Sequence, residues 1–109
     1  MANLPQVNDD SFEKEVMQSQ TPVLVDFSAT WCGPCKMLSP TLEALSKEYA
    51  GTVKFVGVDV DNARQTAVRF RVMSVPTVML FKDGQIVDQA VGNQPRDAWM
   101  KMLDRVLGA

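Results

Sequence analysis

Residues 23–36 read VLVDFSATWCGPCK, and the character of the chain changes sharply within this stretch. Residues 23–27 form a near-continuous apolar run, which is typical of a strand buried on both faces of a parallel sheet. Residues 31–36 contain both cysteines of the chain, separated by two residues, where a helical pattern begins. A cysteine pair at a strand-to-helix junction indicates a redox centre rather than a structural crosslink.

The residues after the first cysteine continue as a long amphipathic helix. One face of this helix carries the second cysteine and a line of apolar side chains at helical spacing, namely Cys35, Leu38, Leu42, Leu45 and Tyr49. Pro40 removes one backbone donor inside the helix, so we expect a kink there. Gly51 is a suitable residue for the end of the helix.

Before and after this segment the chain alternates between helix and strand patterns. We expect a first helix from Asp10, with Glu13 placed three residues later as in a capping box. Residues 53–60 are rich in β-branched side chains and predict a strand, and residues 63–70 predict a short helix.

The C-terminal part of the chain predicts a hairpin and a last helix. Residues 77–81 and 85–91 are the two strands of this hairpin, with Asp83-Gly84 as its tight turn. The last helix opens near Pro95, a residue favoured at the first helical position. The whole order predicts one α/β domain over residues 1–109, with helices on both faces of a mixed sheet.

Composition excludes several classes of function. The net charge of −2 gives no basic surface for nucleic acid, and no apolar stretch approaches the ~20 residues that cross a bilayer. The chain has no histidine, which excludes Cys–His proteases, Ser–His hydrolases and haem attachment through C-x-x-C-H. No secretory signal is visible at the N-terminus, so we expect a cytoplasmic protein, where disulfides are usually catalytic.

Helical geometry makes the two thiols unequal. Cys35 shares the apolar face of the helix and should be buried, whereas Cys32 lies at an exposed helix start. Unpaired N–H groups and the helix dipole stabilise a thiolate at that position. We therefore expect Cys32 to attack a substrate disulfide and Cys35 to resolve the resulting mixed disulfide, leaving a Cys32–Cys35 disulfide.

Two structural explanations of the cysteine pair compete with this chemistry. A crosslink between residues so close in sequence closes a very small loop, which removes little entropy from the unfolded chain. A zinc site needs four ligands, and with no further cysteine or histidine it would have to be shared by two chains. Trp31, beside Cys32, either covers the site and meets a partner or belongs to the core.

Taken together, the motifs resemble those of the thioredoxin family, in family order and spacing over nearly the whole chain. The matching segments are 25–27, 29–36, Pro40, 59–61, 75–77, 81–84 and 91–92. The resemblance implies a five-stranded central sheet flanked by four helices and a general protein disulfide reductase. It also implies that no cofactor is bound, and that electrons come from NADPH through thioredoxin reductase.

The resemblance further implies a substrate surface around the cysteines. The proline that matches Pro76 is cis in the family and packs beside the cysteine pair, although the sequence alone indicates just a loop at this point. The backbone of the preceding residue, here Val75, binds an extended substrate segment by strand addition. The matching surface comprises Trp31, Gly33, Pro34, Val75, Pro76, Gly92 and Asn93.

Asp26 is a candidate proton acceptor. A carboxylate inside an apolar strand is costly to ionise, so its pKa should rise, and it could then take a proton from Cys35. The alternative is an aspartate at a strand end, partly open to water. In the resemblance, Asp26 matches the buried general base of the family.

Two residues near Asp26 depart from the family pattern. Many bacterial members have a lysine where this chain has Gly57, and many have a tryptophan where it has Ser28. Lys54 should point to the opposite face of its strand. We therefore hypothesise that Asp26 lacks a close cationic partner.

Other functions use the same motif spacing. Disulfide oxidants and isomerases share it, and the dipeptide between the cysteines helps to set the direction of exchange; Gly33-Pro34 resembles the reducing members. The alternative from another class is a binding module in which the thiols are incidental. We expect a monomer whose partners are disulfide-containing proteins and a reductase.

Overall fold

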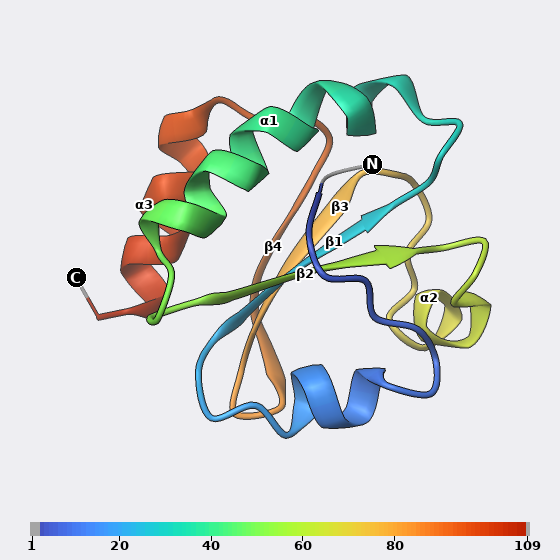
Figure 1. Cartoon of the computed structure of the whole chain (residues 1–109), viewed down its shortest axis with the longest axis horizontal. Helices are drawn as coiled ribbons and strands as arrows, with labels where there is room; N and C mark the ends of the chain where they lie inside the picture. Colours follow the sequence, from blue (N-terminus) through green and yellow to red (C-terminus); the bar gives the residue numbers. More distant parts are fainter. Residues whose placement is uncertain (1–2, 109) are drawn as a thin grey trace.

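The computed structural model describes residues 3–108, and its centre is a mixed sheet (Figure 1). The strands run in the spatial order β2-β1-β3-β4, with β1 parallel to β2 and antiparallel to β3, and β3 antiparallel to β4. Their bounds are Val23–Ser28 for β1, Lys54–Asp59 for β2, Thr77–Lys82 for β3 and Gln85–Val91 for β4.

Helices cover both faces of this sheet, as the sequence predicts. They are the π-helical segment η1 (Glu13–Met17) and the α-helices α1 (Gly33–Glu48), α2 (Arg64–Arg69) and α3 (Arg96–Val106). Figure 1 shows α1 and α3 on one face, and η1 and α2 on the other. We call these the first face and the second face of the sheet.

Alternating residues of the strands supply one apolar core on each face. On the first face, Leu24 and Leu80 pack with the apolar side of α1 and with Trp99 of α3. On the second face, Val25 and Phe81 pack with η1 and with residues beside α2. Because β1 is buried on both faces, every residue of it is buried, as its apolar sequence predicts.

The prediction of five strands is wrong in one detail, because the described residues form four. The N-terminal segment makes a single parallel bridge, Gln6 to Gly57, at the outer edge of β2. Val7 N–H donates to the Gly57 carbonyl (2.8 Å), and Gly57 N–H donates to the Pro5 carbonyl (2.9 Å). Pro5 has no N–H with which to continue the ladder, so a full strand does not form.

The start of the first helix also differs from the prediction. Asp10 is not its cap; instead, Asn8 Oδ1 accepts from the N–H groups of Asp10 and Ser11 at 3.0 Å, and η1 begins at Glu13. The neighbouring Asp9 reaches the start of α2, where it accepts from Thr66 N–H at 2.8 Å. The polar residues before η1 therefore satisfy backbone N–H groups near two helix starts instead of one.

The remaining elements agree with the sequence analysis. In α1, the buried residues on the inner face are Cys35, Leu38, Leu42 and Leu45, and Pro40 lies inside the helix. The hairpin turns at Asp83 and Gly84, whose φ values of 52° and 75° match a tight turn. Within residues 3–108, no helix is long and apolar enough to cross a membrane.

Candidate functional site

The two cysteines form a disulfide at the N-terminus of α1. Cys32 is the residue before the helix, with extended φ and ψ of −92° and 112°, and Pro34 lies in the first turn, where a missing N–H costs nothing. Cys32 Sγ accepts a hydrogen bond from Cys35 N–H at 3.1 Å. The first cysteine thus caps the helix with its sulfur, which places that sulfur at the positive end of the helix dipole.

Cys35 is buried, as predicted, but the exposed position expected for Cys32 is wrong. Both residues expose 3% or less of their surface in the disulfide form. They pack with Ala29 and with the half-buried Val60 and Val75. The segment before Pro76 folds back over the helix start, which a helical pattern cannot reveal.

The Val75–Pro76 peptide bond is cis, as the family resemblance implies. The Val75 carbonyl oxygen lies 3.7 Å from Cys32 Sγ, so this segment lies directly against the disulfide. Gly92 N–H donates to the Pro76 carbonyl at 2.8 Å. Gly92 has a φ of 86°, which favours glycine, and exposed Asn93 follows it.

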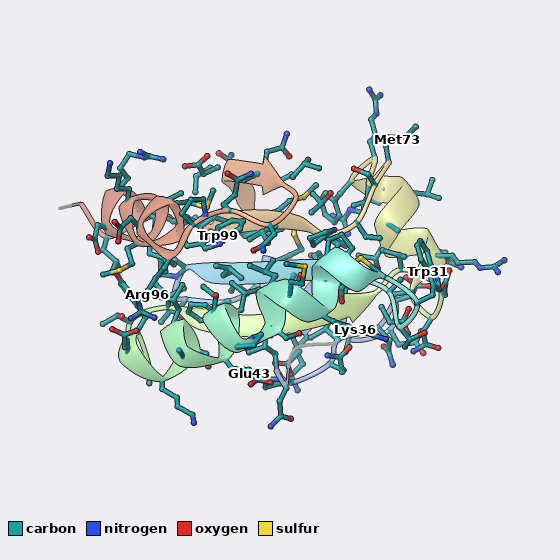
Figure 2. The ribbon with its side chains drawn as sticks, turned by 90° about the horizontal axis from the view of Figure 1, so that it is seen from above. Trp31, Lys36, Glu43, Met73, Arg96 and Trp99 are labelled. Carbon is teal, nitrogen blue, oxygen red and sulfur yellow. A yellow bond between two sulfur atoms is a disulfide. The ribbon has the colours of Figure 1, made fainter. Side chains whose placement is uncertain are left out.

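Trp31 lies beside the disulfide and is not a core residue. Its side chain is 69% exposed, and its indole N–H donates to Asp61 at 2.8 Å. A shallow hollow next to it is lined by Trp31, Val60, Val72, Met73, Ser74 and Val75. Figure 2 shows Trp31 and Met73 at the same end of the molecule, with Arg96 at the other.

Two residues of this surface, Asp61 and Met73, are not expected from the sequence. Asp61, in the turn that follows β2, accepts the hydrogen bond from the Trp31 indole, and Met73 is 91% exposed in the segment before Pro76. Gly33 and Pro34 are exposed as well, whereas Val75 is half-buried and Pro76 is buried. All seven residues of the expected substrate surface therefore lie around the disulfide or in the segments hydrogen-bonded beside it.

Asp26 is buried in the centre of β1, with only 3% of its surface exposed. Burial raises the pKa of this carboxyl from 3.8 to about 6, because the charged form loses its hydration. Its strand neighbours are Gly57 and Val78, which carry no charge. The aspartate is not the partly solvated strand-end residue of the alternative explanation.

Lys54 and Ser28 lie in different surroundings relative to Asp26. Lys54 lies on the second face, where its ammonium group donates to Glu15 of η1 at 2.5 Å. Ser28 is fully buried, and its Oγ has no hydrogen-bond partner among the described residues, which is also true of Asp26 Oδ1. No basic side chain in the described residues pairs with Asp26.

This arrangement defines a class of protein. A disulfide at the start of a helix, with one sulfur capping that helix and a cis-proline segment against it, belongs to a domain that performs dithiol/disulfide exchange. Residues 3–108 contain no group of three or more side chains placed to bind a metal ion, and a single pair of cysteines cannot complete a tetrahedral site.

Comparison with known proteins identifies the family. The family model described as Thioredoxin matches residues 3–105, and the chain belongs to the thioredoxin family. It is 45% identical to Thioredoxin C-2 of Corynebacterium nephridii over 104 residues, which cover 95% of this chain and 96% of that protein. It is 44% identical to a thioredoxin of Synechocystis over 107 residues, covering 98% of this chain and all of that protein.

The activity follows from the family and the cysteine pair together. The protein is a disulfide oxidoreductase whose redox group is the Cys32–Cys35 disulfide itself. Members of this family reduce disulfide-containing proteins and are recycled by a thioredoxin reductase, which takes its electrons from NADPH.

Proposed function

We propose that this protein is a general disulfide reductase in which Cys32 is the attacking thiol and Cys35 the resolving thiol. The observation that carries this division is the hydrogen bond from Cys35 N–H to Cys32 Sγ at 3.1 Å. A backbone N–H at a helix start stabilises negative charge on that sulfur, and Cys35 has no equivalent donor at its own sulfur among the described contacts.

Access to the two sulfurs supports the same order. Cys32 Sγ lies 3.7 Å from the Val75 carbonyl, next to the exposed Trp31, whereas Cys35 lies on the buried side of α1 with Leu38 and Ser39. A substrate disulfide therefore approaches from the side of Cys32.

The reaction has two steps. First, the Cys32 thiolate attacks one sulfur of the substrate disulfide, forms a mixed disulfide and releases the other substrate sulfur as a thiolate. Second, Cys35 loses its proton and attacks Cys32 Sγ, which releases the second substrate thiolate. Two electrons have then passed to the substrate, and the Cys32–Cys35 disulfide remains for the reductase to reduce.

We assign the proton of Cys35 to Asp26. A carboxyl with a pKa of about 6 is largely ionised at neutral pH, yet it is a stronger base than an ordinary aspartate. Asp26 is buried on the face of β1 that packs against α1, and α1 carries Cys35 on its buried side, which supports this assignment.

We propose that the substrate chain lies against the segment before Pro76. The half-buried Val75 presents its backbone next to Cys32, and the Gly92–Pro76 hydrogen bond holds the neighbouring loop in place. An extended peptide can add to this segment as a short strand, with Trp31 and Asn93 bordering it.

The remaining features of the proposed role follow the family. We propose a single domain over residues 1–109 that acts as a cytoplasmic monomer, with a thioredoxin reductase as its electron donor. The family model matches residues 3–105, and the helices and strands extend from Glu13 to Val106, which supports a single domain.

Single serine variants test the order of the two thiols. In insulin reduction with NADPH and a reductase, Cys32→Ser and Cys35→Ser should each lower the rate by about a thousandfold or more. Cys35→Ser should nevertheless accumulate a mixed disulfide with a model substrate, whereas Cys32→Ser should not. Trapping by Cys32→Ser alone would reverse the assignment.

Two further measurements separate the alternatives. Equilibration with glutathione gives the reduction potential, which a reductase requires to be more negative than that of the glutathione pool. The double variant Cys32→Ser, Cys35→Ser tests a binding module, because retained biological activity without thiols would contradict the proposed function.

A further inference from the structure

A row of residues crosses the first face of the sheet at the level of Asp26. Asp26 pairs with Gly57 of β2 and with Val78 of β3, and Gly57 pairs in turn with Gln6. Directly paired residues project to the same face of a sheet. Because Gly57 has no side chain, nothing stands between Gln6 and Asp26 in this row.

The side chain of Gln6 occupies the space that Gly57 leaves free. A Cβ atom added at Gly57 would lie 2.4 Å from Gln6 Nε2, so the carboxamide lies directly across the glycine on the first face. Gln6 Nε2 donates to the Leu4 carbonyl at 3.2 Å. Since neighbouring strands are about 4.8 Å apart, the carboxamide lies within about 8 Å of the Asp26 side chain.

Gln6 and Asp26 differ in their access to solvent. Gln6 is exposed at the outer edge of β2, whereas Asp26 is buried on β1, the next strand inward from β2. Asp26 Oδ1 and Ser28 Oγ, on the same face of β1, are both without a hydrogen-bond partner in the described residues. Buried oxygens of this kind are normally satisfied by ordered water.

Among residues 3–108, the other side chains that face Asp26 do not supply a cation. Val78 of β3 is apolar, α1 contributes Cys35 and Ser39 on its buried side, and Asp59 lies two residues beyond Gly57 on the same face of β2. At the edge, Glu43 of α1 accepts from Asn3 N–H at 2.5 Å, and it adds negative charge rather than positive.

We propose that the Gln6 carboxamide is a positioning residue that covers Asp26 across Gly57 and controls how readily water and protons reach the carboxylate. This inference rests on the proposed role of Asp26 as the proton acceptor for Cys35. A proton accepted there must pass to solvent before the next turnover. At the outer edge of β2, the Gln6 carboxamide, which is the flexible end of an uncharged side chain, covers the path of this proton to solvent.

Charge substitutions at Gln6 test this placement. Gln6→Lys should lower the pKa of Asp26, and the nearly isosteric Gln6→Glu should raise it, each by about 0.4 to 1.5 units for a unit charge about 8 Å away. Carboxyl NMR titration of the reduced protein measures the pKa directly. The pH profile of single-turnover exchange with a small disulfide should shift by the same amount and in the same direction.

The matched controls are Gln89→Lys and Gln89→Glu. Gln89 is exposed on β4 and pairs with Met79 of the second face, so the same charges there are screened and should move the Asp26 pKa by less than about 0.2 units. Gln6→Met, which removes the carboxamide without adding charge, should raise the pKa and serves if a charged variant does not fold.

The outcomes separate this inference from the function on which it rests. Gln6 variants that move the pKa no more than the Gln89 controls would overturn the role of Gln6. If the NMR pKa shifts as expected while the pH profile of exchange does not follow it, Gln6 does position Asp26, but Asp26 is not the proton acceptor.

Discussion

The two faces of β1 use the same strand in opposite ways. On the second face, Val23, Val25 and Phe27 are buried among apolar side chains. This side includes a connected group of aromatic rings, with neighbouring centroids 5.2 to 6.5 Å apart, formed by Phe12, Phe27, Phe70 and Phe81. On the first face, the same strand buries Asp26 and Ser28, each with an oxygen that has no partner in the described residues.

This difference between the two faces shows which residues stabilise the fold that holds the site. Asp26 and Ser28 lie on the face covered by α1, the helix that carries the cysteines, and burying them costs free energy. The aromatic contacts belong to the second face, and Figure 1 shows that η1 and α2, which cover this face, lie on the far side of the sheet from α1. Exchange chemistry and stability should therefore respond to mutation separately on the two faces.

The largest change in the free energy of unfolding should come from a substitution on the second face. Phe81→Ala removes a fully buried ring that meets Phe12 at 5.7 Å and Phe70 at 5.2 Å. We expect the free energy of unfolding to fall by about 3–5 kcal/mol. The rate of insulin reduction at 25 °C by the protein that remains folded should not change.

Urea denaturation and the insulin assay measure these two quantities. Val87→Ala, at an exposed position of β4, is the control and should change stability by less than about 0.5 kcal/mol. A folded Phe81→Ala protein with much slower exchange would show that the two faces are not separable.

The next largest change in the free energy of unfolding is an increase, and it comes from a substitution on the first face. Asp26→Asn removes a buried charge whose pKa is raised from 3.8 to about 6, which corresponds to about 3 kcal/mol of destabilisation when the carboxyl is ionised. At pH 8 we therefore expect the variant to unfold at higher urea concentration than the parent protein, while its resolving step becomes slower.

The pH dependence identifies the cause of this gain. Between about pH 4 and pH 6 the folded state holds a proton on Asp26 that the unfolded state has lost, so the parent protein loses stability relative to Asp26→Asn as pH rises. Below about pH 4 both states are protonated and the difference should be smallest. A stability difference that does not change with pH would contradict burial as the source of the raised pKa.

The features that could be predicted from the sequence are those with local signals. The apolar run of β1, the spacing of Leu38, Leu42 and Leu45 in α1, and the Asp83-Gly84 turn each depend on neighbouring residues. The cis peptide bond before Pro76 is expected from the family resemblance alone, because no local signal in the sequence distinguishes this segment from an ordinary loop.

The features that could not be predicted depend on contacts between distant segments. Cys32 is buried because the segment before Pro76 covers it, and Trp31 is oriented by Asp61. Gln6 reaches across Gly57 from a part of the chain with no helix or strand pattern of its own. Pro5 did carry a signal, since a residue without an N–H limits pairing at a strand edge.

The smallest changes in the free energy of unfolding should come from removing one buried hydroxyl on each face. Thr77 lies on the second face, and its Oγ donates to the Ser74 carbonyl at 2.6 Å, whereas the Ser28 Oγ on the first face has no partner in the described residues. Thr77→Val should therefore lower the free energy of unfolding by about 1 kcal/mol. Ser28→Ala should leave it unchanged or raise it by up to about 1 kcal/mol, because no protein hydrogen bond is lost.

Urea denaturation of both variants at the same pH tests this contrast, and carboxyl NMR of Ser28→Ala tests its cause. If ordered water links Ser28 to Asp26, removing the hydroxyl weakens the hydration of the carboxylate, and the pKa of Asp26 should rise further. A loss of stability in Ser28→Ala as large as that in Thr77→Val would mean that Ser28 Oγ is satisfied after all. The polar pair on the first face would then stabilise the fold, as the hydroxyl on the second face does.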